Sequence, residues 1–271
     1  MWLQVVVSII LSIVLMIVET ARHCELPEQL LQYYKLRDCY RSSLPVVATA
    51  RVDGIEDCIN FGRQRKALAL NFSPNDASSY RNFSVNCQAL GCPETEKSIT
   101  LIADVAFEYH SAYGKWNMTE NATCIRSVGL FTAIEEKQNY TASIEKCQTI
   151  GAHLANVISE VRTNHLSEHI NNTLQDWYKV AYVGLDDMQH EGNFKTATNG
   201  SLLRCFKYRA WGPGHPISKH RNEDCVVLDT ESTWRVVDCR RRFPALCEFY
   251  PAEPAEMIDF RNITCDQITD E

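Results

Sequence analysis

The sequence predicts an α+β fold in a disulfide-bonded chain that enters the secretory pathway. Two helical patterns, at residues 140–150 and 159–170, precede short apolar runs broken by Gly, Pro and Asn, which are typical of strands and loops. The twelve cysteines are an even and unusually large number, which indicates disulfides formed in an oxidising compartment. The net charge of −7 argues against a general nucleic-acid binder, whose surface would be basic.

The N-terminus has the pattern of a signal peptide over residues 1–20. Its apolar run, residues 5–18, is interrupted only by Ser8 and Ser12 and is shorter than the roughly 20 residues that a membrane-spanning helix needs. We expect cleavage after Thr20, a secreted extracellular product and no membrane span after cleavage. An uncleaved anchor remains an alternative, because no Lys or Arg precedes the run and Glu19 follows it.

Eight Asn-x-Ser/Thr triplets without an intervening proline predict a glycoprotein, since such sites belong on secreted surfaces. The predicted glycosylation sites are Asn71, Asn82, Asn117, Asn121, Asn139, Asn171, Asn199 and Asn262.

Residues 21–123 are expected to form a small cysteine-containing N-terminal module that ends in a linker at 115–123. Strand-forming runs at 46–52, 66–72 and 99–109 flank a short helix at 53–65, on which Ile55, Cys58, Ile59 and Gly62 share one face. This order of strand, cysteine-bearing helix and strand resembles an apple/PAN module. Residues 251–271, with six acids against Arg261, are expected to form an acidic tail that Cys265 ties back to the body.

Residues 124–250 carry motifs spread along the whole segment. They include Cys147 with the following Gly-Ala-His-Leu-Ala, Tyr182-Val-Gly-Leu, Glu191-Gly-Asn-Phe and Trp211-Gly. They end with Glu223-Asp-Cys-Val-Val-Leu, Trp234 five residues before Cys239, and Cys247-Glu-Phe. The segment resembles the C-type lectin-like domain family.

The resemblance implies two helices, short antiparallel sheets and a long loop region. It also implies the disulfides Cys147–Cys247 and Cys225–Cys239. The remaining eight cysteines allow 105 pairings. A Cys124–Cys205 bridge, or a bridge from either residue to Cys265, is among them.

The calcium ligands of sugar-binding family members are largely missing. Calcium takes six to eight oxygen ligands, several from carboxylates, and the family supplies them from a Glu-Pro-Asn type triplet, an acid before the third cysteine and an Asn-Asp pair. Here the triplet position reads His215-Pro216-Ile217, and the pair after Trp234 is Arg235-Val236, whose first residue places a positive charge where the ion would sit. Only Glu223 matches, so we expect no cofactor and no calcium at the usual site.

A basic balance over residues 204–247, nine Lys or Arg against five Asp or Glu, is suited to an anionic glycan. The same residues also fit an ordinary solvated rim, with Arg240 to Arg242 exposed on a turn. The residues predicted to bind a ligand are Tyr208, His215, Ile217, Lys219, Arg221, Glu223 and Arg235, with Tyr208 offering a ring face and Trp211 assigned to the core.

One pattern suggests an enzyme. His165-Leu-Ser-Glu168-His169 matches the His-x-x-Glu-His arrangement of zinc proteases. A third ligand cannot be identified, and no other catalytic motif is present, so we expect no catalysis.

The sequence thus predicts a secreted, non-enzymatic recognition or adhesion protein that binds an extracellular glycan or protein, independently of the usual calcium site. Two alternatives stay open: a calcium-dependent carbohydrate-binding lectin with a displaced site, and a structural component of extracellular matrix or cuticle. A calcium-dependent lectin would lose glycan binding in chelator, whereas a structural component would have no saturable ligand.

Overall fold

The computed structural model describes Cys24, residues 31–74, 84–95, 100–114, 122–175, 179–217 and 223–251, and Cys265. The chain packs as two compact units. One contains Leu30–Glu135, Ala142–Ala155 and Leu246–Glu271, and the other contains Glu136–Thr141 and Asn156–Ala245. The division of the chain between the two sheets differs from its division between the two units. One sheet uses strands from residues 34–111, and the other uses strands from residues 123–249.

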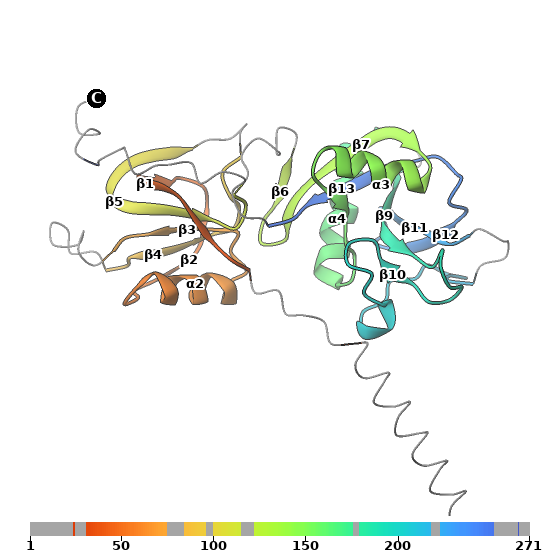
Figure 1. The fold of residues 1–271 in the computed structure, drawn as a ribbon, viewed down its shortest axis with the longest axis horizontal. Helices are drawn as coiled ribbons and strands as arrows, with labels where there is room; N and C mark the ends of the chain where they lie inside the picture. Colours follow the sequence, from red (N-terminus) through yellow and green to blue (C-terminus); the bar gives the residue numbers. More distant parts are fainter. Residues whose placement is uncertain are drawn as a thin grey trace, which may run out of the picture. The chain divides into compact units, whose positions relative to one another are not determined.

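A five-stranded sheet with the order β1-β5-β3-β4-β2 is built from the first part of the chain (Figure 1). All of its neighbouring strands pair antiparallel. The strands are β1 (Tyr34–Ser42), β2 (Val46–Ala50), β3 (Ala69–Phe72), β4 (Cys87–Leu90) and β5 (Leu101–Ser111).

Helix α2 (Ile55–Gln64) covers one face of this sheet, against β3 and β4. Its buried residues are Cys58 and Gly62, the pattern expected for the predicted helical face. A disulfide joins Cys58 to Cys87 on β4. Gly62 is required for the close approach, because a Cβ there would lie 2.6 Å from the Leu70 side chain. The expected strand–helix–strand order of this module is therefore present.

Strand β1 has no counterpart among the sequence-based predictions. Its buried residues Leu36, Cys39 and Ser42 are three apart, whereas a regular strand buries every second residue. Two register shifts, between Lys35/Arg37 and Asp38/Tyr40, account for this spacing. Bulges insert an extra residue and so break the alternation from which a strand is identified.

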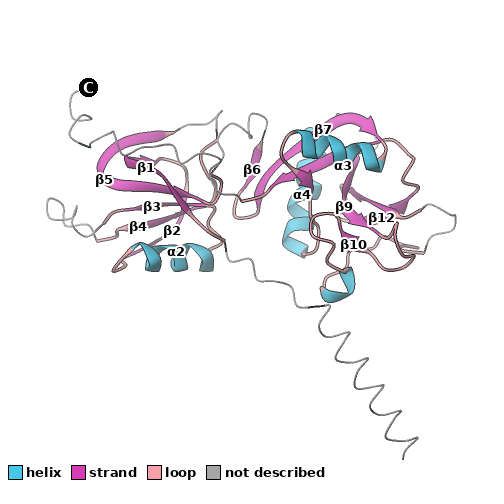
Figure 2. Ribbon diagram, in the orientation of Figure 1, coloured by secondary structure: helices cyan, strands magenta, loops and turns pink. Residues whose placement is uncertain are grey.

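The second sheet has eight strands, with the order β12-β11-β9-β13-β7-β6, β10 pairing with β9 and β8 with β13. Figure 2 draws the strands in magenta and the helices in cyan. Most pairs are antiparallel, but β13 runs parallel to β9 with Ala245 opposite Tyr182. Its strands are β6 (Thr123–Ile125), β7 (Gly129–Gln138), β8 (His153–Leu154), β9 (Val180–Asp186), β10 (Lys195–Thr196), β11 (Cys225–Asp229), β12 (Trp234–Val237) and β13 (Phe243–Phe249).

Two helices accompany this sheet, as the sequence predicts. Helix α3 (Tyr140–Thr149) follows β7, and α4 (Glu160–Thr173) begins at the predicted cap, where the Ser159 hydroxyl accepts a hydrogen bond from the Arg162 backbone N–H at 3.4 Å. The buried face of α4 has helical spacing: Thr163, Leu166, Ser167 and Ile170. The fold of this part is α+β, with long loop segments between β9 and β11.

Among the residues that the structure describes, no helix has the length and apolar character needed to cross a bilayer. The predicted signal peptide, residues 1–20, lies outside the described residues.

Candidate functional site

The loops between β9 and β11 are organised around Trp234, the first residue of β12. Its ring is fully buried and packs edge-on against Trp211 at 5.3 Å and against Tyr208 at 5.4 Å between ring centroids. Phe194 packs against Trp211, with 4.8 Å between the ring centroids. Trp211 packs in this cluster but is only partly buried, so its assignment to the core holds only in part, and the half-buried Tyr208 ring is engaged in packing.

A pocket of about 220 Å³ adjoins this aromatic cluster. Its walls come from three separate stretches of chain, the turn at 192–194, the segment around the short 3-10 helix η3 (Leu203–Cys205), and residues 209–216. The lining residues are Gly192, Asn193, Phe194, Leu202, Leu203, Arg204, Arg209, Trp211 and Pro216. None of them is among the predicted ligand residues. The one sequence signal for this pocket is that residues 193–217 contain Lys195, Arg204, Lys207 and Arg209 but no Asp or Glu.

The position at which the family resemblance implies calcium ligands does not fit a calcium ion. The His215 Nδ1 atom accepts a hydrogen bond from the Val236 backbone N–H at 3.1 Å, so this ring closes the loop onto β12. Ile217 is 72% exposed and offers no oxygen donor. Glu223 is half-buried and is the single carboxylate at these positions. One carboxylate does not provide the several that calcium requires.

The predicted basic surface lies only in part within the described residues. Successive side chains of a strand point to opposite faces, so Arg235 lies on the face of β12 opposite Trp234. There the Arg235 guanidinium pairs with the buried Asp229 carboxylate at 2.7 Å. The Arg235 guanidinium is therefore engaged by the carboxylate at the end of β11. Lys219 and Arg221 lie outside the described residues.

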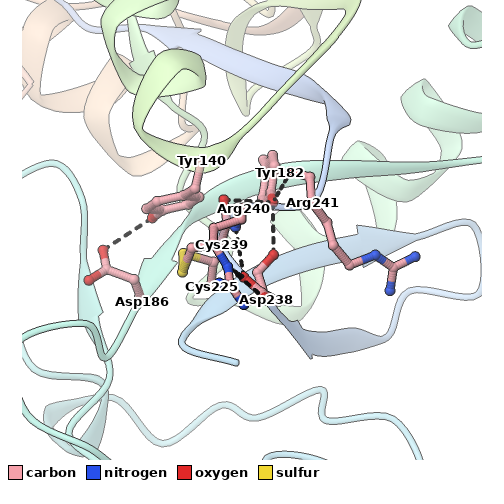
Figure 3. The surroundings of a disulfide bond; sticks show 8 residues. All are labelled: Tyr140, Tyr182, Asp186, Cys225, Asp238, Cys239, Arg240 and Arg241. Atoms are coloured by element: carbon pink, nitrogen blue, oxygen red, sulfur yellow. Dashed lines mark hydrogen bonds and ion pairs between the residues drawn. A yellow bond between two sulfur atoms is a disulfide. The ribbon is translucent and has the colours of Figure 1, made fainter. Parts of the chain in front are cut away.

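The Cys225–Cys239 disulfide closes the end of the β11–β12 hairpin (Figure 3). Beside it the Tyr182 hydroxyl donates to the Arg241 carbonyl at 2.9 Å, and the Tyr140 hydroxyl donates to the Asp186 carboxylate at 3.1 Å. The Arg240 guanidinium holds the pKa of the exposed Asp238 down to about 2. Arg240 to Arg242 are all exposed, as expected for a turn.

The structure contains both disulfides that the resemblance implies, Cys147–Cys247 and Cys225–Cys239. The bridges that the sequence offered for Cys124 and Cys205, to each other or to Cys265, are wrong. Each of these cysteines, and Cys265, pairs with a residue of the first part of the chain that no sequence pattern singled out. The observed pairs are Cys24–Cys205, Cys39–Cys265, Cys58–Cys87 and Cys92–Cys124.

The predicted glycosylation sites differ in accessibility. Asn139, Asn171 and Asn199 are exposed. Asn71 is fully buried, and its amide donates to the Ser42 carbonyl and the Gln88 side chain, each at 2.9 Å. A glycan on Asn71 would replace one of the two donated amide hydrogens and has no space at a fully buried side chain, so this prediction is not compatible with the fold. Asn82, Asn117, Asn121 and Asn262 lie outside the described residues.

The His-x-x-Glu-His segment lies on α4, as expected. His165 and Glu168 form an exposed ion pair at 3.9 Å, while burial lowers the pKa of the His169 imidazole. Within the described parts of the chain, no group of three or more His, Cys, Asp or Glu side chains is placed to hold a metal ion.

Comparison with known proteins assigns this part of the chain. The Lectin C-type domain model matches residues 136–249. Residues 136–249 form a C-type lectin domain. The mannose-binding protein of Gallus gallus is 34% identical over 93 residues, and Collectin-10 of Gallus gallus is 29% identical over 116 residues. These matches cover 34% and 43% of this chain, and 33% and 40% of the length of the relatives. The solved structure of human lithostathine has a TM-score of 0.43 at 22% identity and covers 48% of this chain and 98% of that one.

The lectin domain also contains three neighbouring carboxylates, Asp187, Glu191 and Asp224, whose negative charges repel one another. Asp187 is 4% exposed; one carboxylate oxygen accepts from the Gly192 backbone N–H at 2.7 Å, and the other has no partner among the described residues. Burial, with the nearby charges of Glu191 and Asp224, raises the pKa of Asp187 to about 6. Burial also raises the pKa of Asp224, and Glu191 adds to that effect.

This arrangement predicts that Asp187→Asn stabilises the protein near neutral pH in chelator. The folded-state pKa is above that of the unfolded chain, so the folded state favours the protonated carboxyl and loses stability as pH rises from about 4 to about 6. The amide keeps an acceptor for Gly192 without the charge, which we expect to gain about 1–2 kcal/mol near pH 7 and almost nothing near pH 4. Thermal unfolding at both pH values measures this. Glu168→Gln, an exposed change of the same kind, is the control, and an equal gain at both pH values would contradict the interpretation.

Proposed function

We propose that this protein is a secreted, non-enzymatic recognition protein that binds an extracellular glycan through its C-type lectin domain, without calcium at the usual position. Lectin relatives support carbohydrate recognition as the role of this domain, and one of them is named for binding mannose. The observation that carries the calcium-independent part is the hydrogen bond from the Val236 N–H to His215, next to the exposed apolar Ile217. Where sugar-binding family members have two side-chain oxygen donors, this chain has the hydrogen-bonded imidazole of His215 and the aliphatic side chain of Ile217.

The proposal predicts glycan binding that survives chelator. The full secreted protein is applied to a panel of immobilised neutral, sulfated and uronic-acid glycans, first with calcium and then with a chelator. We expect the same glycans to bind in both conditions, with binding to charged glycans weakening as salt rises because exposed charges are screened.

Glu223→Gln is the matched variant for this experiment. It removes the only carboxylate at the usual calcium position while keeping size and hydrogen-bonding capacity. Unchanged binding is expected if no calcium is held there, and a loss that parallels the loss in chelator would overturn the proposal. If no glycan is bound in either condition, the partner is a protein or the chain is a structural component of extracellular matrix.

A second candidate function, a lectin that depends on calcium at a displaced position, is favoured by one observation. Asp187 has an unpartnered carboxylate oxygen, and burial first, then the charges of Glu191 and Asp224, raise its pKa. These side chains are not grouped closely enough to hold a metal ion by themselves, so the surrounding loop backbone would have to supply further oxygen ligands. Calcium binding there would raise the unfolding temperature relative to chelator in the parent protein but not in Asp187→Asn. Equal unfolding temperatures with calcium and with chelator would exclude this candidate.

A further inference from the structure

The pocket beside the Trp234 cluster combines an apolar floor with a basic rim. We propose that it binds a single sugar ring that carries a sulfate or a carboxylate, with the ring on Trp211 and the anionic group at Arg204 and Arg209. This inference rests on the proposed function and specifies its ligand class and its site.

The floor of the pocket is rigid because the Trp211 ring packs against two buried aromatic rings, Trp234 and Phe194. Trp211 is only partly buried, whereas Trp234, which packs edge-on against it, is fully buried, and Phe194 at its side is 6% exposed. Leu203 is buried in the same wall. An aromatic face that is fixed in this way offers a flat apolar surface without an entropic cost of ordering it, which suits the C–H face of a sugar ring.

The rim contains two arginines, Arg204 and Arg209, that form no ion pair with a described carboxylate. One terminal nitrogen of the Arg209 guanidinium donates to the Phe206 carbonyl at 2.7 Å and to the Tyr208 carbonyl at 2.6 Å, which orients the side chain. The other donors of this guanidinium are not used by any described residue, and Arg204 forms no ion pair with a described residue. Guanidinium groups recognise sulfate and carboxylate oxygens through paired hydrogen bonds.

The size of the pocket limits the ligand to one ring. Its volume of about 220 Å³ is below the roughly 300–1,000 Å³ of sites that enclose drug-sized molecules. The segment 193–217, which supplies every lining residue except Gly192, contains no acid. Gly192 follows Glu191 and donates its N–H to the Asp187 carboxylate, so an anionic group fits at Arg204 and Arg209 and not at Gly192. A terminal or protruding charged residue of a longer glycan meets both conditions.

The test compares dextran sulfate, polygalacturonate and uncharged dextran as probes for the full secreted protein in chelator. We expect dextran not to bind and at least one charged polymer to bind, and the stronger one identifies sulfate or carboxylate as the preferred group. In Arg204→Ala/Arg209→Ala, binding of that polymer is expected to fall by roughly tenfold or more. Both arginines are exposed, so folding is preserved.

The control variant is Arg241→Ala/Arg242→Ala, which removes the same charge from an exposed turn of the same domain. We expect it to change binding by about twofold or less, the effect of long-range charge alone. An equal loss in the two variants would overturn the pocket proposal in favour of a diffuse basic surface. Competition adds a second readout: galactose 6-sulfate displaces dextran sulfate at lower concentration than sodium sulfate does if the ring contacts Trp211, and equal potency would overturn that contact.

The outcomes separate this proposal from the proposed function. A neutral glycan that binds in chelator and is unaffected by Arg204→Ala/Arg209→Ala would overturn the pocket proposal and leave the proposed function intact. Binding of dextran sulfate that needs both arginines but disappears in chelator would leave the pocket and overturn calcium independence.

Discussion

Removing the Cys147–Cys247 disulfide is expected to cost about 3–5 kcal/mol of unfolding free energy. The bridge joins α3 to β13, both of its cysteines are fully buried, and it closes a loop over a sequence separation of 100 residues. Its loss frees the unfolded chain over this length and leaves two small side chains in a packed interior. We expect Cys147→Ala/Cys247→Ala to unfold at markedly lower denaturant concentration, as measured by circular dichroism.

The Cys225–Cys239 bridge of the same domain provides the comparison, since it spans a separation of only 14 residues. In the chain-entropy model a loop of about 15 residues contributes roughly 3 kcal/mol and one of about 100 residues roughly 4.7. Cys225→Ala/Cys239→Ala should therefore cost about 1.5–2 kcal/mol less than the longer bridge. An equal or larger cost for the shorter bridge would show that local hairpin packing, and not loop entropy, dominates.

Elements with a strong local signal could be predicted from the sequence. The cap at Ser159, the helical spacing of α4 and the cysteine-bearing helix α2 depend on contacts within a few residues, and they occur where predicted. The two bridges implied by family resemblance are also present. The bridges from Cys24, Cys39 and Cys92 were not predictable, because each joins residues that only the tertiary fold brings together.

The candidate site was predictable only in part, for two physical reasons. The pocket is lined by three stretches of chain that meet through long loops, and only the tertiary fold brings Phe194 and Leu203 into one lining with Trp211. The ion pair of Arg235 with Asp229 was missed because the charge of Arg235 was considered without the alternation of the strand. Since Trp234 points into the aromatic cluster, the next residue of β12 has to point to the opposite face.

That opposite face contains the interaction with the second large expected effect, the Asp229 carboxylate. Asp229 is 4% exposed, and one of its oxygens accepts from the backbone N–H groups of Glu231 and Thr233, each at 2.9 Å. The other oxygen accepts from the Thr233 hydroxyl and from Arg235, each at 2.7 Å. This carboxylate therefore defines the turn between β11 and β12 and fixes where Trp234 begins.

We expect Asp229→Ala to destabilise the protein by about 3–4 kcal/mol, because two backbone donors and a hydroxyl lose their acceptor and Arg235 loses its partner. Asp229→Asn keeps one acceptor and should cost less. Arg235→Ala should cost only about 1 kcal/mol or less, since the arginine is half-exposed and the backbone donors keep their carboxylate. Denaturant unfolding of the three variants measures this order.

Asp238→Ala is the matched control, because Asp238 also pairs with an arginine, Arg240, but on the exposed surface. We expect only a small change there. Arg235→Ala also shows what Arg235 does. If Arg235 only anchors the turn, the variant loses stability and binds dextran sulfate as before. If Arg235 is a ligand residue, the variant loses binding and keeps its stability. Loss of binding in Arg235→Ala without loss of stability would contradict the placement of Arg235 and return it to the ligand surface.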